Sequence, residues 1–253
     1  MTMKKSLLLL SAALCSCLAW ADPQAINLAG QQRMLSQRIV KAYAQIGTQV
    51  LPGDARVQLD QGLTQFEANL EALDQVPEKE ASRRALADLK ATWKPLKAAA
   101  MAPVSLEGAR QLDMRAEAVL LAAERLTQAL QDESAEPARR WTNLAGRQRM
   151  LSQRLVKAYM LRQWGLESSA LEEQMDNAMA GFSAAQESLS RQSDNSTELR
   201  QLLEEIALQW EWLRTALATE GAASFRFIVA ASSEAILELT DQATRQAPGQ
   251  SPP

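Results

Sequence analysis

The sequence predicts an all-α protein of two tandem antiparallel four-helix bundles, which together form an internal pseudo-dimer. Three observations favour this fold class. The 253-residue chain holds only 10 Gly and 9 Pro, and it is rich in the helix-favouring residues Ala, Leu, Gln, Glu and Arg. It has no convincing run of the apolar–polar alternation that is typical of strands. A 17-residue stretch also occurs twice, once in each half of the chain.

The repeated stretch is "NLAGQQRMLSQRIVKAY" at residues 27–43 and "NLAGRQRMLSQRLVKAY" at residues 143–159. Between the two copies 15 of 17 positions are identical, at an offset of 116. Weaker matches continue beyond it: Phe66 with Phe182, Leu73 with Leu189, Asp60 with Asp176, "WKPL" at 93–96 with "WEWL" at 210–213, and "EAVL" at 117–120 with "EAIL" at 234–237. The last two pairs need a shift of one residue. We interpret the chain as a tandem duplication of a four-helix unit.

Helix-breaking and helix-starting residues divide the chain into about eight segments of about 24 residues, each roughly 36 Å long as a helix. The expected breaks are residues 51–54, 76–78, 102–105, 132–137, 165, 193–197 and 219–221. This spacing predicts one bundle over residues 22–133 and a second over residues 138–246. The Pro-rich end, residues 247–253, is expected to be a disordered tail.

Residues 1–21 have the features of a signal peptide. A short basic start, "MTMKK", precedes an apolar run, and "AWA" fits cleavage after Ala21. We therefore expect a periplasmic protein exported by a cleavable leader. Two alternatives stay open, since the leader could remain as an uncleaved membrane anchor or "LCSC" could direct lipidation of Cys17.

The composition excludes several kinds of chemistry. The chain has no His, and both of its Cys lie in the leader, so catalysis by His or thiolate and the usual metal and haem ligands are excluded from the mature protein. We expect no enzyme activity and no cofactor. Loss of two leader lysines takes Lys+Arg from 27 to 25 against 30 acidic residues, so the mature charge is near −5. Such a protein is not expected to bind nucleic acid.

The repeated stretch has two faces when it is placed on a helical wheel. Its leucines and isoleucines form a core stripe, which does not require strict identity because apolar residues of similar size interchange at modest cost. The second face is largely polar, and it is repeated to the letter. It carries Asn27, Gly30, Arg33, Met34, Gln37, Arg38 and Lys41, with Asn143, Gly146, Arg149, Met150, Gln153, Arg154 and Lys157 in the other copy. A glycine inside a helix costs about 1 kcal/mol relative to alanine, so something on this face is expected to approach the backbone closely.

The topology suggests what this face does. Four antiparallel helices return the chain to its starting end, so the two motif helices can run parallel across an approximate two-fold axis. Arg33 and Arg149 would then face each other. Two guanidiniums about 8 Å apart repel by roughly 2 kcal/mol, whereas an anion about 4 Å from each is attracted by roughly 4 kcal/mol per contact. We favour a small planar oxyanion between them, and the alternative is a salt bridge from each arginine to an interhelical Glu or Asp.

Other residues of this face are weaker ligand candidates: Asn27, Gln37, Arg38, Asn143, Gln153 and Arg154. For Arg38 and Arg154 we favour ion pairs at the surface or interface. For Asn27 and Asn143 a capping or interface role is as well supported as ligand contact. Residues expected to pack or snorkel along the bundle surface are Lys41, Lys157, Tyr43 and Tyr159. Residues expected in the core are Trp93, Trp210 and Trp212.

At "NLAGQQRMLSQR" and "NLAGRQRMLSQR" the sequence resembles the PilJ/NarX-like sensor domain family. This family includes the periplasmic N-terminal domains of type IV pili methyl-accepting chemotaxis transducers and of nitrate/nitrite sensor kinases. The resemblance covers both halves and implies four-helix bundles that pair through their first helices. It also implies that Arg33 and Gly30, with Arg149 and Gly146, hold one ligand on the axis. The transmembrane helices and cytoplasmic modules usual in the family are missing from the sequence.

Two functions follow as expectations. The first is an exported, stand-alone sensory or binding protein for a small oxyanion, with nitrate or nitrite as first choice. The second is a helical interaction protein that docks a membrane chemoreceptor, a sensor kinase or a type IV pilus component without a small ligand. In either case the output must pass through a partner protein.

Overall fold

The computed structural model describes residues 23–76, 79–133, 138–192, 195–219 and 223–246, and this part of the chain is all-α. Its helices are α1 (Pro23–Gly47), α2 (Pro52–Leu73), α3 (Glu80–Ala100), α4 (Leu106–Asp132), α5 (Ala138–Gln163), α6 (Ser169–Ser190), α7 (Thr197–Ala218) and α8 (Ala223–Arg245). The expected signal peptide, residues 1–21, and the expected tail, residues 247–253, lie outside the described residues.

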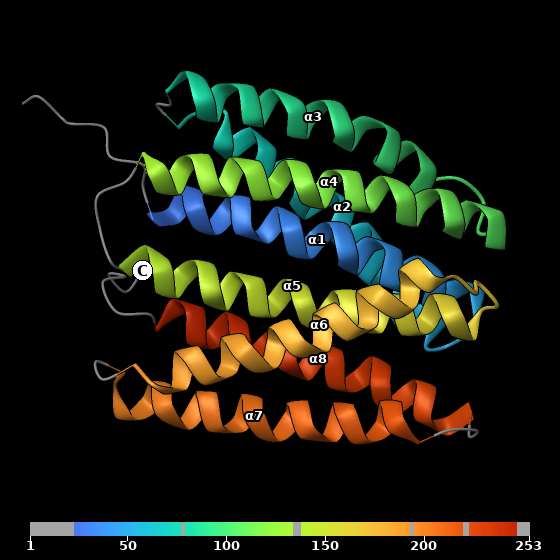
Figure 1. Ribbon diagram of the computed structural model, residues 1–253. Coiled ribbons are helices and arrows are strands. Elements are labelled where there is room, and N and C mark those ends of the chain that lie inside the picture. The colour runs from blue at the N-terminus through green and yellow to red at the C-terminus, as the bar shows by residue number, and fades with distance from the viewer. Residues whose placement is uncertain (1–22, 77–78, 134–137, 193–194, 220–222, 247–253) are drawn as a thin grey trace, which may run out of the picture.

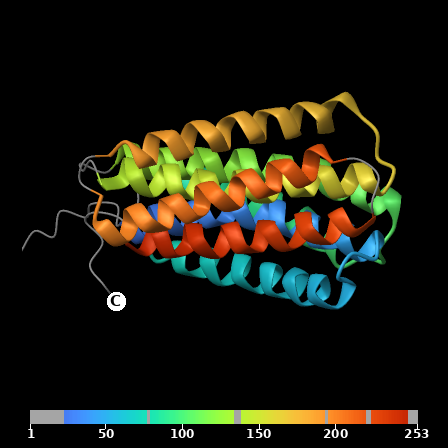
Figure 2. The same cartoon turned by 90° about the horizontal axis from the view of Figure 1, so that it is seen from below.

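The helices form two four-helix groups, α1–α4 and α5–α8, which confirms the predicted fold class. Within each group the first helix packs on the second and the fourth, and the third packs on the fourth. The backbones of the second and third helices of each group lie further apart, and these helices meet through aromatic side chains. Helices α1 and α5 pack against each other more extensively than either packs against any single helix of its own group, and they start at the same end of the molecule (Figures 1 and 2). The motif helices are therefore the parallel central seam of a pseudo-dimer.

Serine side chains mark the starts of three helices. The hydroxyl oxygens of Ser105, Ser168 and Ser196 accept hydrogen bonds from backbone N–H groups three residues later, at the starts of α4, α6 and α7. This N-cap satisfies a donor that has no partner within the helix. Helix α2 begins instead with Pro52, which needs no backbone donor at the first helical position.

The apolar core repeats in both halves. Phe66 stacks on Trp93 with ring centroids 3.8 Å apart, and Phe182 stacks on Trp210 at 4.0 Å. The prediction of a core position for Trp212 is wrong, because its side chain is 62% exposed. Residues two apart on a helix differ by about 200° in direction, so Trp210 and Trp212 cannot both face the core.

The described helices differ from membrane spans. None of them combines the length with the apolar composition needed to cross a bilayer.

Candidate functional site

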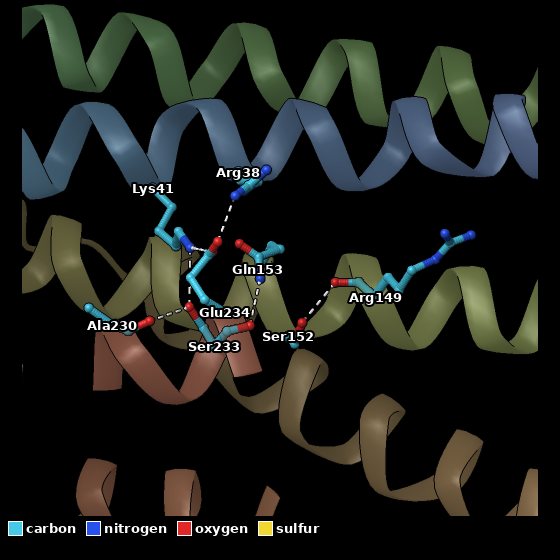
Figure 3. A network of polar contacts seen from close by, with 8 residues as sticks. All are labelled: Arg38, Lys41, Arg149, Ser152, Gln153, Ala230, Ser233 and Glu234. Carbon is cyan, nitrogen blue, oxygen red and sulfur yellow. Dashed lines mark hydrogen bonds and ion pairs between the residues drawn. The ribbon is translucent and has the colours of Figure 1, made fainter. Parts of the chain in front are cut away.

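The seam between α1 and α5 brings Arg33 and Arg149 together. Both side chains are buried, with 1% and 2% of their surface exposed. A Cβ atom built on Gly146 would lie 3.2 Å from Arg33 Nη2 and 3.5 Å from Arg149 Nη2, so the two guanidiniums meet at this glycine. Figure 3 shows the Arg149 side chain extending from α5 into the space beside α1. The facing arrangement expected for the two arginines is therefore the one that the fold produces.

Each arginine is held by one carboxylate and one amide. Arg33 Nη1 donates to Glu124 Oε2 at 2.7 Å, and its Nη2 donates to Asn143 Oδ1 at 2.8 Å. Arg149 repeats the pattern, with Nη1 2.6 Å from Asp241 Oδ1 and Nη2 2.7 Å from Asn27 Oδ1. The carboxylate comes from the fourth helix of the same half, whereas the amide comes from the other half. Asn27 and Asn143 thus hold the two halves together, which is the interface role given above as one alternative for these residues.

The carboxylates were not among the residues predicted for the site. Glu124 and Asp241 are equivalent positions, because they share the offset of 117 that aligns "EAVL" with "EAIL". Extending that alignment by one further turn of helix would have paired them. The Glu-for-Asp difference hid the match, and charge was the only common feature.

The motif glycines make room for the guanidiniums. A Cβ on Gly30 would also lie 3.2 Å from Arg33 Nη2, which is closer than ordinary van der Waals contact. Alanine at either position would force the arginine to move by a few tenths of an ångström. This close approach explains why glycine stands inside both helices despite its cost of about 1 kcal/mol.

Burial affects the two arginines in two ways: it lowers the pKa of Arg33, and it leaves one N–H donor of each side chain without a partner among the described residues. Burial lowers the pKa of Arg33, the Glu124 carboxylate opposes that change, and the charge of Arg149 adds to it. The guanidinium keeps its charge near neutral pH because arginine is not deprotonated in proteins. In the part of the chain that the structure describes, Nε of Arg33 and Nε of Arg149 are buried without a hydrogen-bond partner.

A second polar cluster lies about two turns further along the seam (Figure 3). Arg38 Nη2 bonds Glu234 Oε2 at 2.6 Å, and Lys41 Nζ contacts the other oxygen of the same carboxylate. Lys41 also bonds Ser233 Oγ at 3.1 Å. Burial acts to raise the pKa of Glu234, but the charges of Lys41 and Arg38 outweigh it and lower that pKa. These contacts join α1 of the first half to α8 of the second.

The other half carries the equivalent cluster. Arg154 Nη2 lies 2.6 Å from Glu117 Oε2, and Lys157 Nζ lies 2.8 Å from Glu117 Oε1 and 2.6 Å from Asp113 Oδ1. Arg38 and Arg154 therefore form the interface ion pairs that we favoured. The prediction that Lys41 and Lys157 snorkel along the surface is wrong, because both are fully buried and paired with carboxylates of the opposite half. A buried lysine must be paired, and the sequence alone did not show its partner.

The motif glutamines lie between these two clusters. Gln37 Nε2 donates to Ser36 Oγ at 3.1 Å, and Gln153 Nε2 donates to the Ser233 carbonyl at 3.0 Å. Within the described residues the Oε1 atoms of both glutamines are buried and accept no hydrogen bond. Among the described contacts, neither glutamine forms a hydrogen bond with Arg33 or Arg149.

The remaining motif residue, the tyrosine, differs between the copies. Tyr43 is fully buried rather than at the surface, and its hydroxyl donates to the Pro103 carbonyl at 3.0 Å. Tyr159 is half-buried. Among the described residues no group of three or more metal-ligating side chains occurs.

Comparison with known protein families gives a match over the first half of the chain. Residues 19–131 match the PilJ family, described as the type IV pili methyl-accepting chemotaxis transducer N-terminal domain. A search of curated proteins and a search of solved structures found no match. The match ends before the second copy of the motif, although α5–α8 repeat the helix order and the arginine site of α1–α4. The family match therefore covers the first half of the chain, and the second half is a helical group built on the same plan.

Proposed function

We propose that this protein is a periplasmic sensory or binding protein that takes one small oxyanion, nitrate or nitrite first, between Arg33 and Arg149. The observation that carries the proposal is a pair of buried guanidiniums that face each other at Gly146. Each guanidinium is paired with one carboxylate, Glu124 or Asp241, which is the alternative stated for the two arginines, so a bound anion would have to displace these carboxylates. The PilJ-type domain of the first half supports a sensory role.

The unpartnered Nε atoms offer hydrogen-bond donors to an anion, and the partly exposed carboxylates can move aside to admit it. The side chain of Glu124 is 49% exposed and that of Asp241 is 35% exposed, so both can turn toward solvent while the arginines stay buried. Asn27 and Asn143 accept from the arginines through Oδ1, and a rotation of the amide would present Nδ2 as a donor to an oxyanion. The anion therefore competes with carboxylates of the protein itself.

Calorimetric titration of the purified protein with nitrate, nitrite and chloride tests the proposal. We expect one site per chain, and loss of binding in Arg33→Ala and in Arg149→Ala. Arg84→Ala is a matched control, since this arginine lies on α3 with 78% of its side chain exposed. Two independent sites would contradict a ligand shared by both halves. Absence of heat with every oxyanion, together with an unchanged melting temperature, would contradict oxyanion binding itself.

A specific observation favours the second function, docking of a chemoreceptor, sensor kinase or pilus component. Leu208 and Trp212 lie four residues apart on α7, and they are 56% and 62% exposed. Residues at this spacing share one face of a helix, and aromatic residues are enriched where proteins bind one another. Under this proposal the α7 face is the surface that docks the partner. Crosslinking to candidate partners, lost in Trp212→Ser but kept in Arg33→Ala, would support docking without a ligand.

A further inference from the structure

The two clusters that join the halves differ in charge. Arg154 and Lys157 face two carboxylates, Glu117 and Asp113, so their charges balance. Arg38 and Lys41 occupy the equivalent positions but face a single carboxylate, Glu234. Among the described residues, no further carboxylate pairs with either side chain. The cluster of Arg38 and Lys41 therefore carries one uncompensated positive charge.

The cause is a substitution at one position of the repeat. With the offset of 117 that pairs Glu117 with Glu234, Asp113 corresponds to Ala230, and Ala116 corresponds to Ser233. Ser233 Oγ replaces the lost hydrogen-bond acceptor of the lysine, at 3.1 Å from Lys41 Nζ. A neutral hydroxyl does not replace the lost negative charge. Figure 3 shows Ala230 one turn of α8 before Glu234, on the side of Lys41.

Burial makes this imbalance costly. Lys41 and Ser233 are fully buried, and 17% of the Arg38 side chain is exposed. Burial lowers the pKa of Lys41, opposed by Glu234 and assisted by the charge of Arg38. An unbalanced charge away from water is unfavourable unless a counter-charge is supplied. In the cluster of Arg154 and Lys157, Asp113 supplies this counter-charge.

Solvent reaches the unbalanced cluster at Arg38, whereas Lys41 and Ser233 are fully buried. A groove of about 710 Å³ between α1, α2 and α8 is lined by Arg38 and Leu237. Within the described residues only Nη2 of the Arg38 guanidinium has a hydrogen-bond partner, so Nε and Nη1 remain as donors. Two carboxylates also line this groove: Asp60 is exposed on α2 and forms no ion pair in the described structure, whereas Asp241 is paired with Arg149. Lys41 has three N–H donors and uses two of them.

We propose that the cluster of Arg38, Lys41 and Ser233 is a second anion site, which binds one small singly charged anion where the other half carries the Asp113 carboxylate. The shared chemistry is a compact monoanion, either chloride or a small carboxylate such as acetate. The site is separate from the arginine pair at Gly146, and the anion acts as a counter-ion that stabilises the contact between α1 and α8.

The test uses the internal repeat as its own control. Melting temperatures are measured while gluconate is replaced by chloride, or in a second arm by acetate, at constant ionic strength. We expect the wild-type protein to melt about 3 °C higher at a tenfold excess of anion over its dissociation constant. The double variant Ala230→Asp with Ser233→Ala copies the balanced cluster, and it should lose this dependence. A response to chloride alone, or to acetate as well, identifies which monoanion the site accepts.

A reciprocal double variant tests the same proposal in case the first double variant does not fold. Asp113→Ala with Ala116→Ser copies the unbalanced cluster into the other half, so its melting temperature should respond to the anion about twice as strongly. An unchanged response in both double variants would overturn the proposal. Arg33→Ala should keep the response, which separates this site from the oxyanion site: loss of nitrate binding leaves the counter-ion effect intact, and the reverse also holds.

Discussion

At the scale of single residues, the site depends on buried cations whose partners come from distant parts of the chain. Arg33 takes an amide from Asn143, and Arg149 takes one from Asn27. Removing one partner of a buried charge is far more damaging than removing an exposed charge, because the remaining charge stays desolvated. Substitutions around the arginine pair therefore affect both ligand affinity and stability, and the two effects can be separated.

The carboxylate that competes with the ligand offers the first prediction. In Glu124→Gln the Arg33 guanidinium loses its counter-charge but keeps an acceptor of similar size, so we expect nitrate to bind about tenfold more tightly, equivalent to roughly 1.4 kcal/mol. Calorimetric titration measures the affinity. Glu107→Gln on the same helix, with a side chain 69% exposed, is the control and should bind as the wild type does. Weaker binding in Glu124→Gln would show that this carboxylate assists the anion.

The glycines offer the second prediction. A Cβ on Gly146 would crowd Arg33 at 3.2 Å and contact Arg149 at 3.5 Å, whereas a Cβ on Gly30 would approach Arg33 alone. We expect Gly146→Ala to weaken nitrate binding more than Gly30→Ala does, although each gains about 1 kcal/mol of helix propensity. Gly53→Ala is the control, since a Cβ there has no neighbour within 4 Å. Equal affinities in all three variants would mean that the ligand does not approach Gly146.

Glu234 offers a prediction about pH. Its folded pKa is lowered, so its contribution to stability is present above the unfolded value of about 4.3 and is lost as the pH falls through the folded pKa. At pH 7 we expect Glu234→Gln to reduce the free energy of unfolding by about 3 kcal/mol, because Lys41 stays buried without its carboxylate. The difference from the wild type should shrink below about pH 4. Urea unfolding at several pH values measures it, and a difference independent of pH would contradict the ion-pair explanation.

At the scale of elements, helix order and helix limits were predictable, and partner choice was not. Turn residues and the internal repeat predicted the eight described helices, since each break follows from Gly, Pro or a capping residue. The wheel predicted which face of the motif meets the other half. It could not predict that Lys41 reaches Glu234, which is 193 residues away, because a helical wheel carries no information about the neighbouring helix. The segment "WEWL" holds two tryptophans that cannot share one face of α7, so Trp210 is buried and Trp212 is exposed.

The helix starts offer a prediction at this scale. Ser105 caps α4, the helix that supplies Glu124, and its hydroxyl accepts from Gly108 N at 3.0 Å. We expect Ser105→Ala to lower the free energy of unfolding by about 1 kcal/mol without changing the affinity for nitrate, because the cap lies far along α4 from the site. Thermal unfolding and titration measure the two effects. Ser105→Asp, which can also cap, should unfold as the wild type does.

At the scale of the whole molecule, the most extensive helix pair among the described residues joins the two halves. Helices α1 and α5 form the seam, and both charged clusters bridge α1 to α8 or α5 to α4. The halves therefore behave as one structural unit, and we expect a single cooperative unfolding transition by calorimetry. Two separate transitions would mean that each group of four helices is stable without the seam. Glu117→Gln and Glu234→Gln should each lower this one transition rather than split it.

The covalent link between the two halves affects how the site depends on protein concentration and how the two copies of the repeat can diverge in sequence. Partners that meet as separate chains lose their shared site when the protein becomes scarce, whereas tethered partners stay at a high effective concentration. The arginine pair of this protein is thus assembled at any abundance of the chain. Tethering also frees each half to change alone, since a mutation in one copy is no longer imposed on its mate. Asp113 in one copy and Ala230 at the equivalent position of the other are such a change, and it lets one seam hold two dissimilar clusters.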